Sequence, residues 1–116
     1  QIVAAENEIR RAPRFDRAIE VHFNTALIPM ANGAEVLYYS TKNIGVAALV
    51  NRAIASSFRS LDLGATKGRP WVGLDKTHQP ALLVEVLFIN DSGDAGKIRD
   101  QYFCEKAVQG TMAGFG

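Results

Sequence analysis

A single acid, Glu85, lies in the middle of the most apolar run of the chain, residues 80–90. Nine of these eleven residues are apolar, and most of them are aliphatic. Such a run is typical of a strand that is buried on both faces, as in the middle of a mostly parallel sheet. A carboxylate there is costly to bury unless a cation pairs with it or a ligand binds it. Glu85 is therefore either a functional acid or the partner of a cation such as Arg69 or Lys76.

A second apolar segment, residues 18–24, ends in the polar side chains His22 and Asn24. Sheets of α/β proteins place their ligands at the carboxyl ends of strands. We therefore expect His22 and Glu85 to approach each other at one edge of a common sheet. The alternative for His22 is a core histidine that is hydrogen-bonded to the backbone.

Length and composition limit what the chain can be. Its 116 residues suffice for one small domain, residues 1–116, with a modest core. The net charge of +1 gives no argument for binding nucleic acid or an anionic membrane. One cysteine, Cys104, excludes an intrachain disulfide and a cysteine-rich zinc site. No apolar run reaches the roughly 18 residues of a membrane span, and the N-terminus lacks a signal-peptide pattern.

The hydrophobic periodicity predicts an α/β fold with a partly parallel sheet. Residues 65–79 are polar and are expected to form a loop, in which only residues 71–72 resemble a strand. Gly64 is expected to end the central helix as a left-handed cap. The last predicted helix should bury one face that includes Tyr102, Val108 and Met112. The predicted elements are a helix at 3–11, strands at 17–23 and 33–40, a helix at 43–60, a strand at 81–89 and a helix at 95–113.

Three segments together resemble the zinc-dependent N-acetylmuramoyl-L-alanine amidases of bacterial autolysins and phage endolysins. Residues 20–24 read Glu-Val-His-Phe-Asn, where the family has Ser-(Ile/Leu)-His-x-Asn. Residues 33–40 read Gly-Ala-Glu-Val-Leu-Tyr-Tyr-Ser and are similar to the family's Gly-x-Glu-x-(Tyr/Phe)-Tyr-Ser. Residues 80–90 follow an arginine-containing loop, here with Arg69, and are similar to Pro-Ala-x-Leu-Val-Glu-x-Gly-Phe-x-x-Asn.

The resemblance implies an α/β fold with a mostly parallel sheet flanked by helices. It implies one zinc ion held by two histidines and one glutamate, with His22 as the last of these ligands. Zinc lowers the pKa of its bound water to about 7, which makes a nucleophile at neutral pH. Glu85 matches the catalytic general base, and Arg69 and Asn24 are candidates for binding substrate. The substrate would be the amide bond between N-acetylmuramic acid and L-alanine in peptidoglycan, so the protein would act at the cell wall.

The chain departs from the family pattern near its beginning. It has no Asp-x-Gly-His-Gly segment, which carries the first zinc ligand, and Glu6 and Glu8 lie too close to His22 to match the second. Glu20 replaces a small serine, and Leu87 replaces a glycine. The sequence therefore resembles the C-terminal two-thirds of the domain, without its N-terminal strand and helix. We expect such a chain to self-associate or to dock on the missing N-terminal segment.

Other functions remain open at this point. A non-catalytic remnant could bind cell wall or a partner through the old substrate groove. A metal-free α/β hydrolase that uses Glu85 and His22 is less favoured, because the chain has no Gly-x-Ser-x-Gly elbow. Glu35 is expected to hold a loop by accepting backbone hydrogen bonds, and His78 to be a solvated loop residue.

Overall fold

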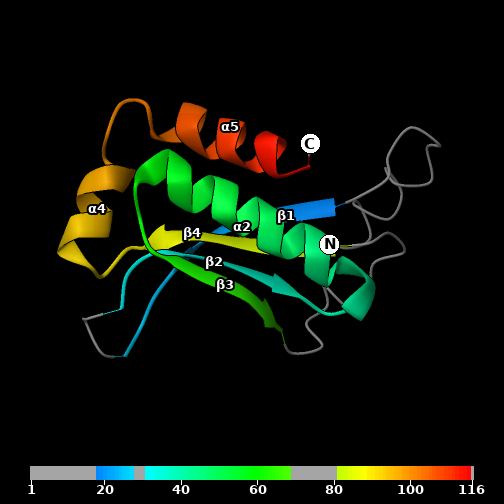
Figure 1. Ribbon diagram of the computed structural model, residues 1–116. Coiled ribbons are helices and arrows are strands. Elements are labelled where there is room, and N and C mark those ends of the chain that lie inside the picture. The colour runs from blue at the N-terminus through cyan, green and yellow to red at the C-terminus, as the bar shows by residue number, and fades with distance from the viewer. Residues whose placement is uncertain (1–17, 28–30, 69–80, 116) are drawn as a thin grey trace, which may run out of the picture.

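Four strands form one sheet in the order β1-β4-β2-β3. The computed structural model describes residues 18–27, 31–68 and 81–115 (Figure 1). β1 pairs in parallel with β4, β2 pairs in parallel with β3, and β2 and β4 are antiparallel. The prediction of a mostly parallel α/β sheet is therefore confirmed. The strands are β1 (Ala18–Asn24), β2 (Ala34–Tyr38), β3 (Asp62–Lys67) and β4 (Ala81–Phe88).

Strand β4 is buried on both faces, as its composition predicts. Its side chains alternate between two clusters, because successive residues of a strand point to opposite faces. Leu82 and Val84 belong to the main core with the central helix, whereas Leu83 packs on the other face with Leu37 and Ala18.

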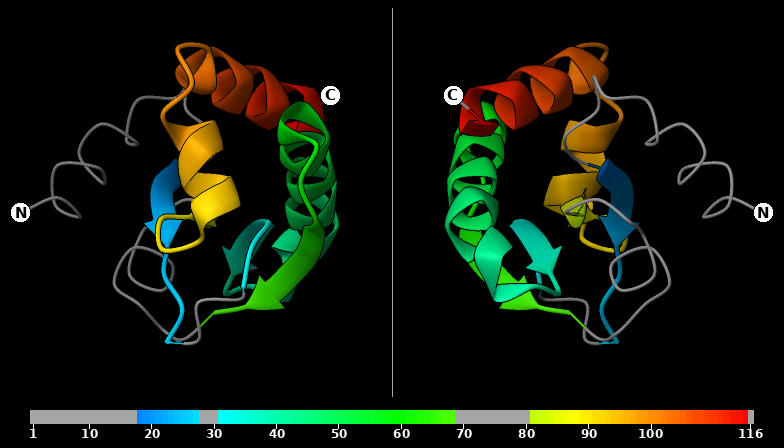
Figure 2. Two further views of the ribbon diagram at one scale, coloured as in Figure 1. Left: turned by 90° about the vertical axis from the view of Figure 1, so that its left-hand side faces the viewer. Right: turned by 90° about the vertical axis from the view of Figure 1, so that its right-hand side faces the viewer.

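The central helix, α2 (Ile44–Phe58), follows a short 3-10 turn, η1 (Thr41–Asn43). Val50 and Ile54 on α2 are completely buried against the sheet. Two further helices come after β4, namely α4 (Ser92–Ile98) and α5 (Phe103–Phe115). Figure 2 shows α2 and α5 together on one side of the sheet. The opposite face of the sheet is therefore free of these two helices.

The prediction for residues 43–67 is wrong at the end of the helix. Helix α2 ends at Phe58, and Arg59 takes the left-handed conformation, with φ at 50°. Gly64 lies instead inside β3, with φ at 85°. Residues 62–67 were missed as a strand because three of the six are polar and one is glycine. They form the edge of the sheet, where few side chains are buried and the sequence shows little apolar alternation. Asp62 accepts hydrogen bonds from the Asn51 side chain and from the Gly64 N–H, and so fixes this edge.

The single helix predicted at 95–113 is also wrong, because a turn divides it into α4 and α5. The turn centres on Asp100, whose side chain accepts a hydrogen bond from Tyr102 N–H at 2.8 Å. The expected buried face, which also includes Ile98 and Phe103, is formed only in part. Ile98 and Phe103 pack against the core, whereas Tyr102, Val108 and Met112 are exposed, as is Cys104. In the described part of the chain nothing covers that side of α5. The helix predicted at 3–11 and the strand-like residues 71–72 fall outside the described residues.

Candidate functional site

Three ionisable residues lie in one row across the sheet. His22 on β1 is the register partner of Glu85 on β4, and Glu85 is in turn the partner of Glu35 on β2. Side chains of register partners project from the same face of a sheet and lie close together. The structure therefore brings His22 and Glu85 together, at the edge where the carboxyl ends of β1 and β4 meet the beginning of β2.

The row is on the face opposite to α2. Residues 82, 84 and 86 of β4 pack with α2, so Glu85 must project from the other face. The same alternation directs Ile19 toward the helical layer and His22 away from it. Helices α2 and α5 therefore do not cover the row, because both lie on the other side of the sheet (Figure 1).

Glu85 has a buried carboxylate oxygen that lacks a partner. Its Oε2 atom is inaccessible to solvent and has no hydrogen-bond partner among the described residues. Burial raises the pKa of Glu85 above its ordinary value of 4.5, and the nearby Glu35 carboxylate raises this pKa further. His22 acts in the opposite direction and lowers the pKa of Glu85. A carboxyl group in this environment is suited to accept and return a proton.

His22 has a second acidic neighbour on its own strand. Its Nε2 atom lies 3.4 Å from Oε2 of Glu20, so the two form an ion pair when His22 is protonated. Half of the His22 side chain is exposed, which excludes the core histidine that was the alternative interpretation. The replacement of the family's serine by Glu20 thus places a carboxylate directly against the imidazole.

Glu35 and Thr66 are parts of the site that the sequence did not indicate. Oε2 of Glu35 accepts a hydrogen bond from the Thr66 hydroxyl at 2.9 Å, and its Oε1 accepts a longer one from the Asn24 amide at 3.5 Å. Glu35 was expected to accept backbone hydrogen bonds, whereas these donors are side chains. The only signal available in the sequence was the Gly-x-Glu spacing, since the pairing of β2 with β4 is not local. Asn24 is thereby placed beside the row of ionisable residues.

The described residues do not by themselves fit a complete zinc site. Within the described ranges there is no group of three or more His, Cys, Asp or Glu side chains placed to hold a metal ion. His22 supplies one imidazole, and three or four ligands are needed. Arg69, Lys76, His78 and Glu8 lie outside the described residues. The pairing of Glu85 with Arg69 or Lys76 therefore stays untested.

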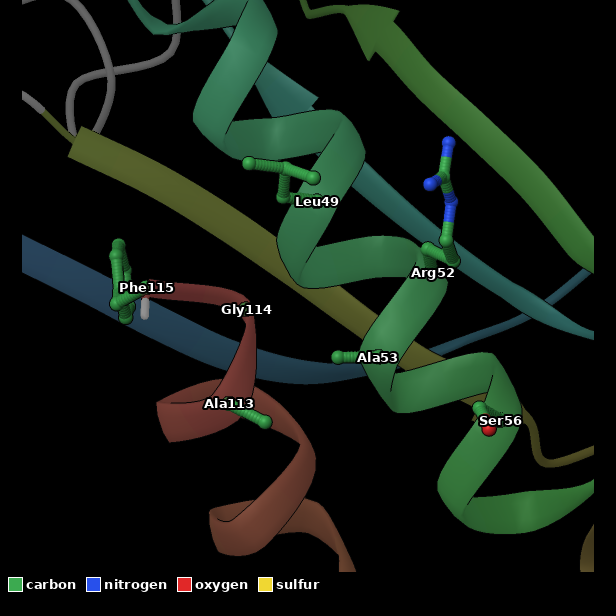
Figure 3. A pocket seen from close by; sticks show the side chains of 7 residues that line it. All are labelled: Leu49, Arg52, Ala53, Ser56, Ala113, Gly114 and Phe115. Atoms are coloured by element: carbon green, nitrogen blue, oxygen red, sulfur yellow. The ribbon is translucent and has the colours of Figure 1, made fainter.

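Two hollows lie on the helical side of the sheet, away from this row. The first hollow has a volume of about 400 Å³ and is bordered by α2 and the end of α5. It is lined by Leu49, Arg52, Ala53, Ser56, Ala113, Gly114 and Phe115 (Figure 3). The other is an apolar groove between β1 and α5, lined by Ile19, Val21, Phe103, Cys104, Ala107, Val108, Thr111 and Met112. Neither contains an ionisable pair comparable to His22 and Glu85. In the described ranges, no helix has both the length and the apolar character needed to cross a membrane.

Comparisons with a family model and with solved structures point to the same protein family. A family model described as N-acetylmuramoyl-L-alanine amidase matches residues 3–115. No curated protein sequence matches the chain. Similar solved structures include the catalytic domain of the amidase CwlV from Bacillus (Paenibacillus) polymyxa var. colistinus, with a TM-score of 0.83 at 19% identity. They also include an amidase from Clostridium difficile 630 (0.82, 21%) and AmiC2 of Nostoc punctiforme (0.81, 20%).

These structures are longer than the present chain. The comparisons cover 97%, 97% and 96% of this chain but only 63%, 62% and 62% of CwlV, the C. difficile amidase and AmiC2, respectively. The chain thus spans less than two thirds of the length of the structures it matches. At sequence identities of 19%, 20% and 21%, the structural similarity shows a shared fold.

Proposed function

Because the chain belongs to the family of N-acetylmuramoyl-L-alanine amidases, we propose that it forms the larger part of an enzyme domain that hydrolyses peptidoglycan. The bond cleaved is the amide between N-acetylmuramic acid and L-alanine. The protein acts at the cell wall, and peptidoglycan is its macromolecular partner. We assign residues 1–116 to one domain.

One observation supports this function most directly: Glu85 has a buried oxygen, without a partner among the described residues, next to His22 on the sheet face opposite α2. In this proposal Oε2 of Glu85 accepts a proton from the attacking water and returns it to the leaving amine of L-alanine. Asn24 and Arg69 bind the substrate, and Asn24 is oriented by its hydrogen bond to Glu35.

We further propose that the enzyme depends on zinc and that His22 is one of its ligands. When bound, the metal supplies a water of lowered pKa. The remaining ligands must come from outside the described residues, so we derive no step of the reaction through the metal. The edge of β1 and the apolar groove beside it are the surfaces on which a further segment of the domain, or a second copy of the chain, would dock.

Two variants of the full-length protein test this function because they should fail in different ways. Glu85→Gln should abolish release of L-alanine-linked peptides from peptidoglycan while zinc stays bound, since a base is lost but no ligand is. His22→Ala should lose both zinc and activity, because fewer ligands remain to hold the ion. Turnover and stoichiometric zinc content, each measured on the same preparations, distinguish the two outcomes.

Two results would contradict the proposal. Wild-type turnover in Glu85→Gln would mean that Glu85 is a structural acid. A wild-type protein that binds peptidoglycan without cleaving it, and contains no zinc, would favour the non-catalytic remnant. Asp100→Ala is a suitable control, because its exposed side chain bonds only a local backbone N–H, that of Tyr102, at 2.8 Å.

A further inference from the structure

The pairing of β1 with β4 becomes irregular where the site lies. The register shifts between His22 and Asn24, and pairing resumes with Asn24 opposite Phe88. The last backbone bond between the two segments runs from Ile89 N–H to the Asn24 carbonyl at 2.9 Å. Beyond Asn24 the described backbone ladder ends, so a link that holds the next residues must come from another kind of interaction.

The side chain of Asn90 supplies that interaction. Its Oδ1 atom accepts a hydrogen bond from Ala26 N–H at 3.3 Å, and its Nδ2 atom donates one to the Ala26 carbonyl. One primary amide thus bonds both polar groups of a single residue, as a peptide group of a neighbouring strand would. The pairing of β1 with the segment after β4 is extended beyond the last strand residue.

Within residues 25–27, this pair is the only described hydrogen-bonded link to another part of the fold. The N–H of Thr25 donates to Oδ1 of its neighbour Asn24, at 2.9 Å, and so stays within the end of β1. Further along the chain, the N–H of Gly33 donates to the buried Asp94 carboxylate at 2.8 Å. The segment that follows β4 therefore holds both ends of the connection between β1 and β2, with Asn90 at the end nearer the site.

We propose that Asn90 is a positioning residue: its amide holds the end of β1 so that Asn24 and His22 project toward Glu35 and Glu85. The inference rests on the proposed function and deepens it. Asn24 reaches Glu35 through a bond of 3.5 Å, which a small outward movement of the strand end would break. Asn90 itself touches no residue of the row, so it acts through the backbone of Ala26.

Asn90 is exposed, so replacing it should leave the fold intact. Asn90→Ala removes both bonds, Asn90→Asp keeps the acceptor but loses the donor, and Asn90→Gln keeps both groups on a longer side chain. Asp100→Ala is a matched control, because Asp100 is also exposed and also bonds a backbone N–H, that of Tyr102, away from the sheet face.

The experiment measures hydrogen exchange of the Ala26 amide, the resonances of the Asn24 side-chain amide and the kinetic constants in the full-length protein. For Asn90→Ala we expect exchange at Ala26 to be at least about tenfold faster, and the Asn24 resonances to move. We expect kcat to fall roughly tenfold with little change in KM, since misplaced groups slow the reaction more than they weaken binding. Asn90→Gln should recover part of each effect, and Asp100→Ala should show none.

Unchanged exchange at Ala26 in Asn90→Ala would overturn the proposed clamp whether or not the protein is active. Faster exchange without movement of the Asn24 resonances, or with a kcat equal to that of Asp100→Ala, would overturn the positioning role. Failure of the proposed function has a different signature: Glu85→Gln would keep wild-type turnover. In that case the Ala26 exchange and the Asn24 resonances still decide whether Asn90 positions the strand end.

Discussion

At the scale of single residues, burial of a carboxyl group destabilises its charged form relative to its neutral form. Glu85 lies between Val84 and Val86, and both valines are buried against the helical layer. The oxygen Oε2 lacks a hydrogen-bond donor among the described residues, so burial is not offset there by a bond that favours ionisation. Such an arrangement lowers the free energy of unfolding at neutral pH. In the proposed function it also supplies a base of raised pKa.

This cost predicts how stability depends on pH. Since the folded pKa of Glu85 is raised above 4.5, the folded state holds its proton over a pH range in which the unfolded state has released it. Stability from this group is therefore present below pH 4.5 and is lost as pH rises through the folded pKa. Glu85→Gln should match the wild type in acid and become the more stable protein at neutral pH.

Urea unfolding of both proteins at several pH values between 4 and 8 measures this difference. Each pH unit by which the folded pKa is raised is worth up to about 1.4 kcal/mol. A difference in unfolding free energy that is constant over the whole range would show that the ionisation of Glu85 does not couple to folding. Glu105→Gln is the matched control, since it makes the same change at an exposed glutamate on α5.

The sequence identified His22 and Glu85 but not the neighbours that tune them. Both residues interrupt apolar strands, and such an interruption is visible along the chain. Glu35 affects Glu85 only because β2 pairs antiparallel with β4, and Glu20 meets His22 only through its side-chain rotamer. Strand pairing depends on contacts that are distant in sequence and cannot be read from local periodicity. The placement of Glu20 and His22 on one face follows from the period of the strand, but their approach to 3.4 Å also requires particular rotamers.

At the scale of elements, α2 and α5 approach each other through glycines. A Cβ atom added at Gly114 would lie 2.3 Å from the Val50 Cα atom and 2.8 Å from its backbone nitrogen. One turn earlier, Gly110 lies somewhat less close to the backbone of Ile54, where an added Cβ would lie 3.0 Å from the Cα atom. Two glycines at a spacing of four thus lie on the same side of α5 and let the two backbones come close.

Gly114→Ala should therefore destabilise the protein although alanine is the better helix former. The clash is with backbone atoms, which cannot rotate away, so we expect a loss of about 1–3 kcal/mol. Gly96→Ala in α4 is the matched control, because nothing lies within 4 Å of its added Cβ atom. That variant should gain about 0.5–1 kcal/mol from reduced chain entropy. Chemical unfolding measures both, and equal effects of the two variants would contradict the close approach.

The elements that were predicted correctly are those with a strong apolar signal. Strands β2 and β4 and helix α2 each bury a regular apolar pattern, and β1 is an apolar segment of which only Ala18 is buried. The predicted positions of all four agree with the structure to within a few residues. Strand β3 was missed because Asp62, Thr66 and Lys67 carry no such pattern at the edge of the sheet. The division between α4 and α5 depends on Asp100, whose capping of Tyr102 N–H is a local polar interaction that an apolar periodicity does not reveal.

At the scale of the whole molecule, the side of α5 nearest β1 is uncovered. β1 is an edge strand of the described sheet, and Val21 on it is 58% exposed. Across the groove, Met112 on α5 is 63% exposed. Solvation of this much apolar surface next to unpaired strand edges is unfavourable and favours association with another polypeptide.

The 116-residue chain on its own should therefore associate with itself, more strongly as its concentration rises. Replacing two of the groove residues together, Val21→Lys and Met112→Lys, should shift sedimentation toward the monomer, because two lysines oppose burial of the groove. Leu61→Lys is the control, since Leu61 is 60% exposed but does not line the groove. If the wild type sediments as a monomer at all concentrations and unfolds in one sharp transition, the groove is not an association surface. If Leu61→Lys dissociates the chain as effectively as the double variant does, association runs through another face of the molecule.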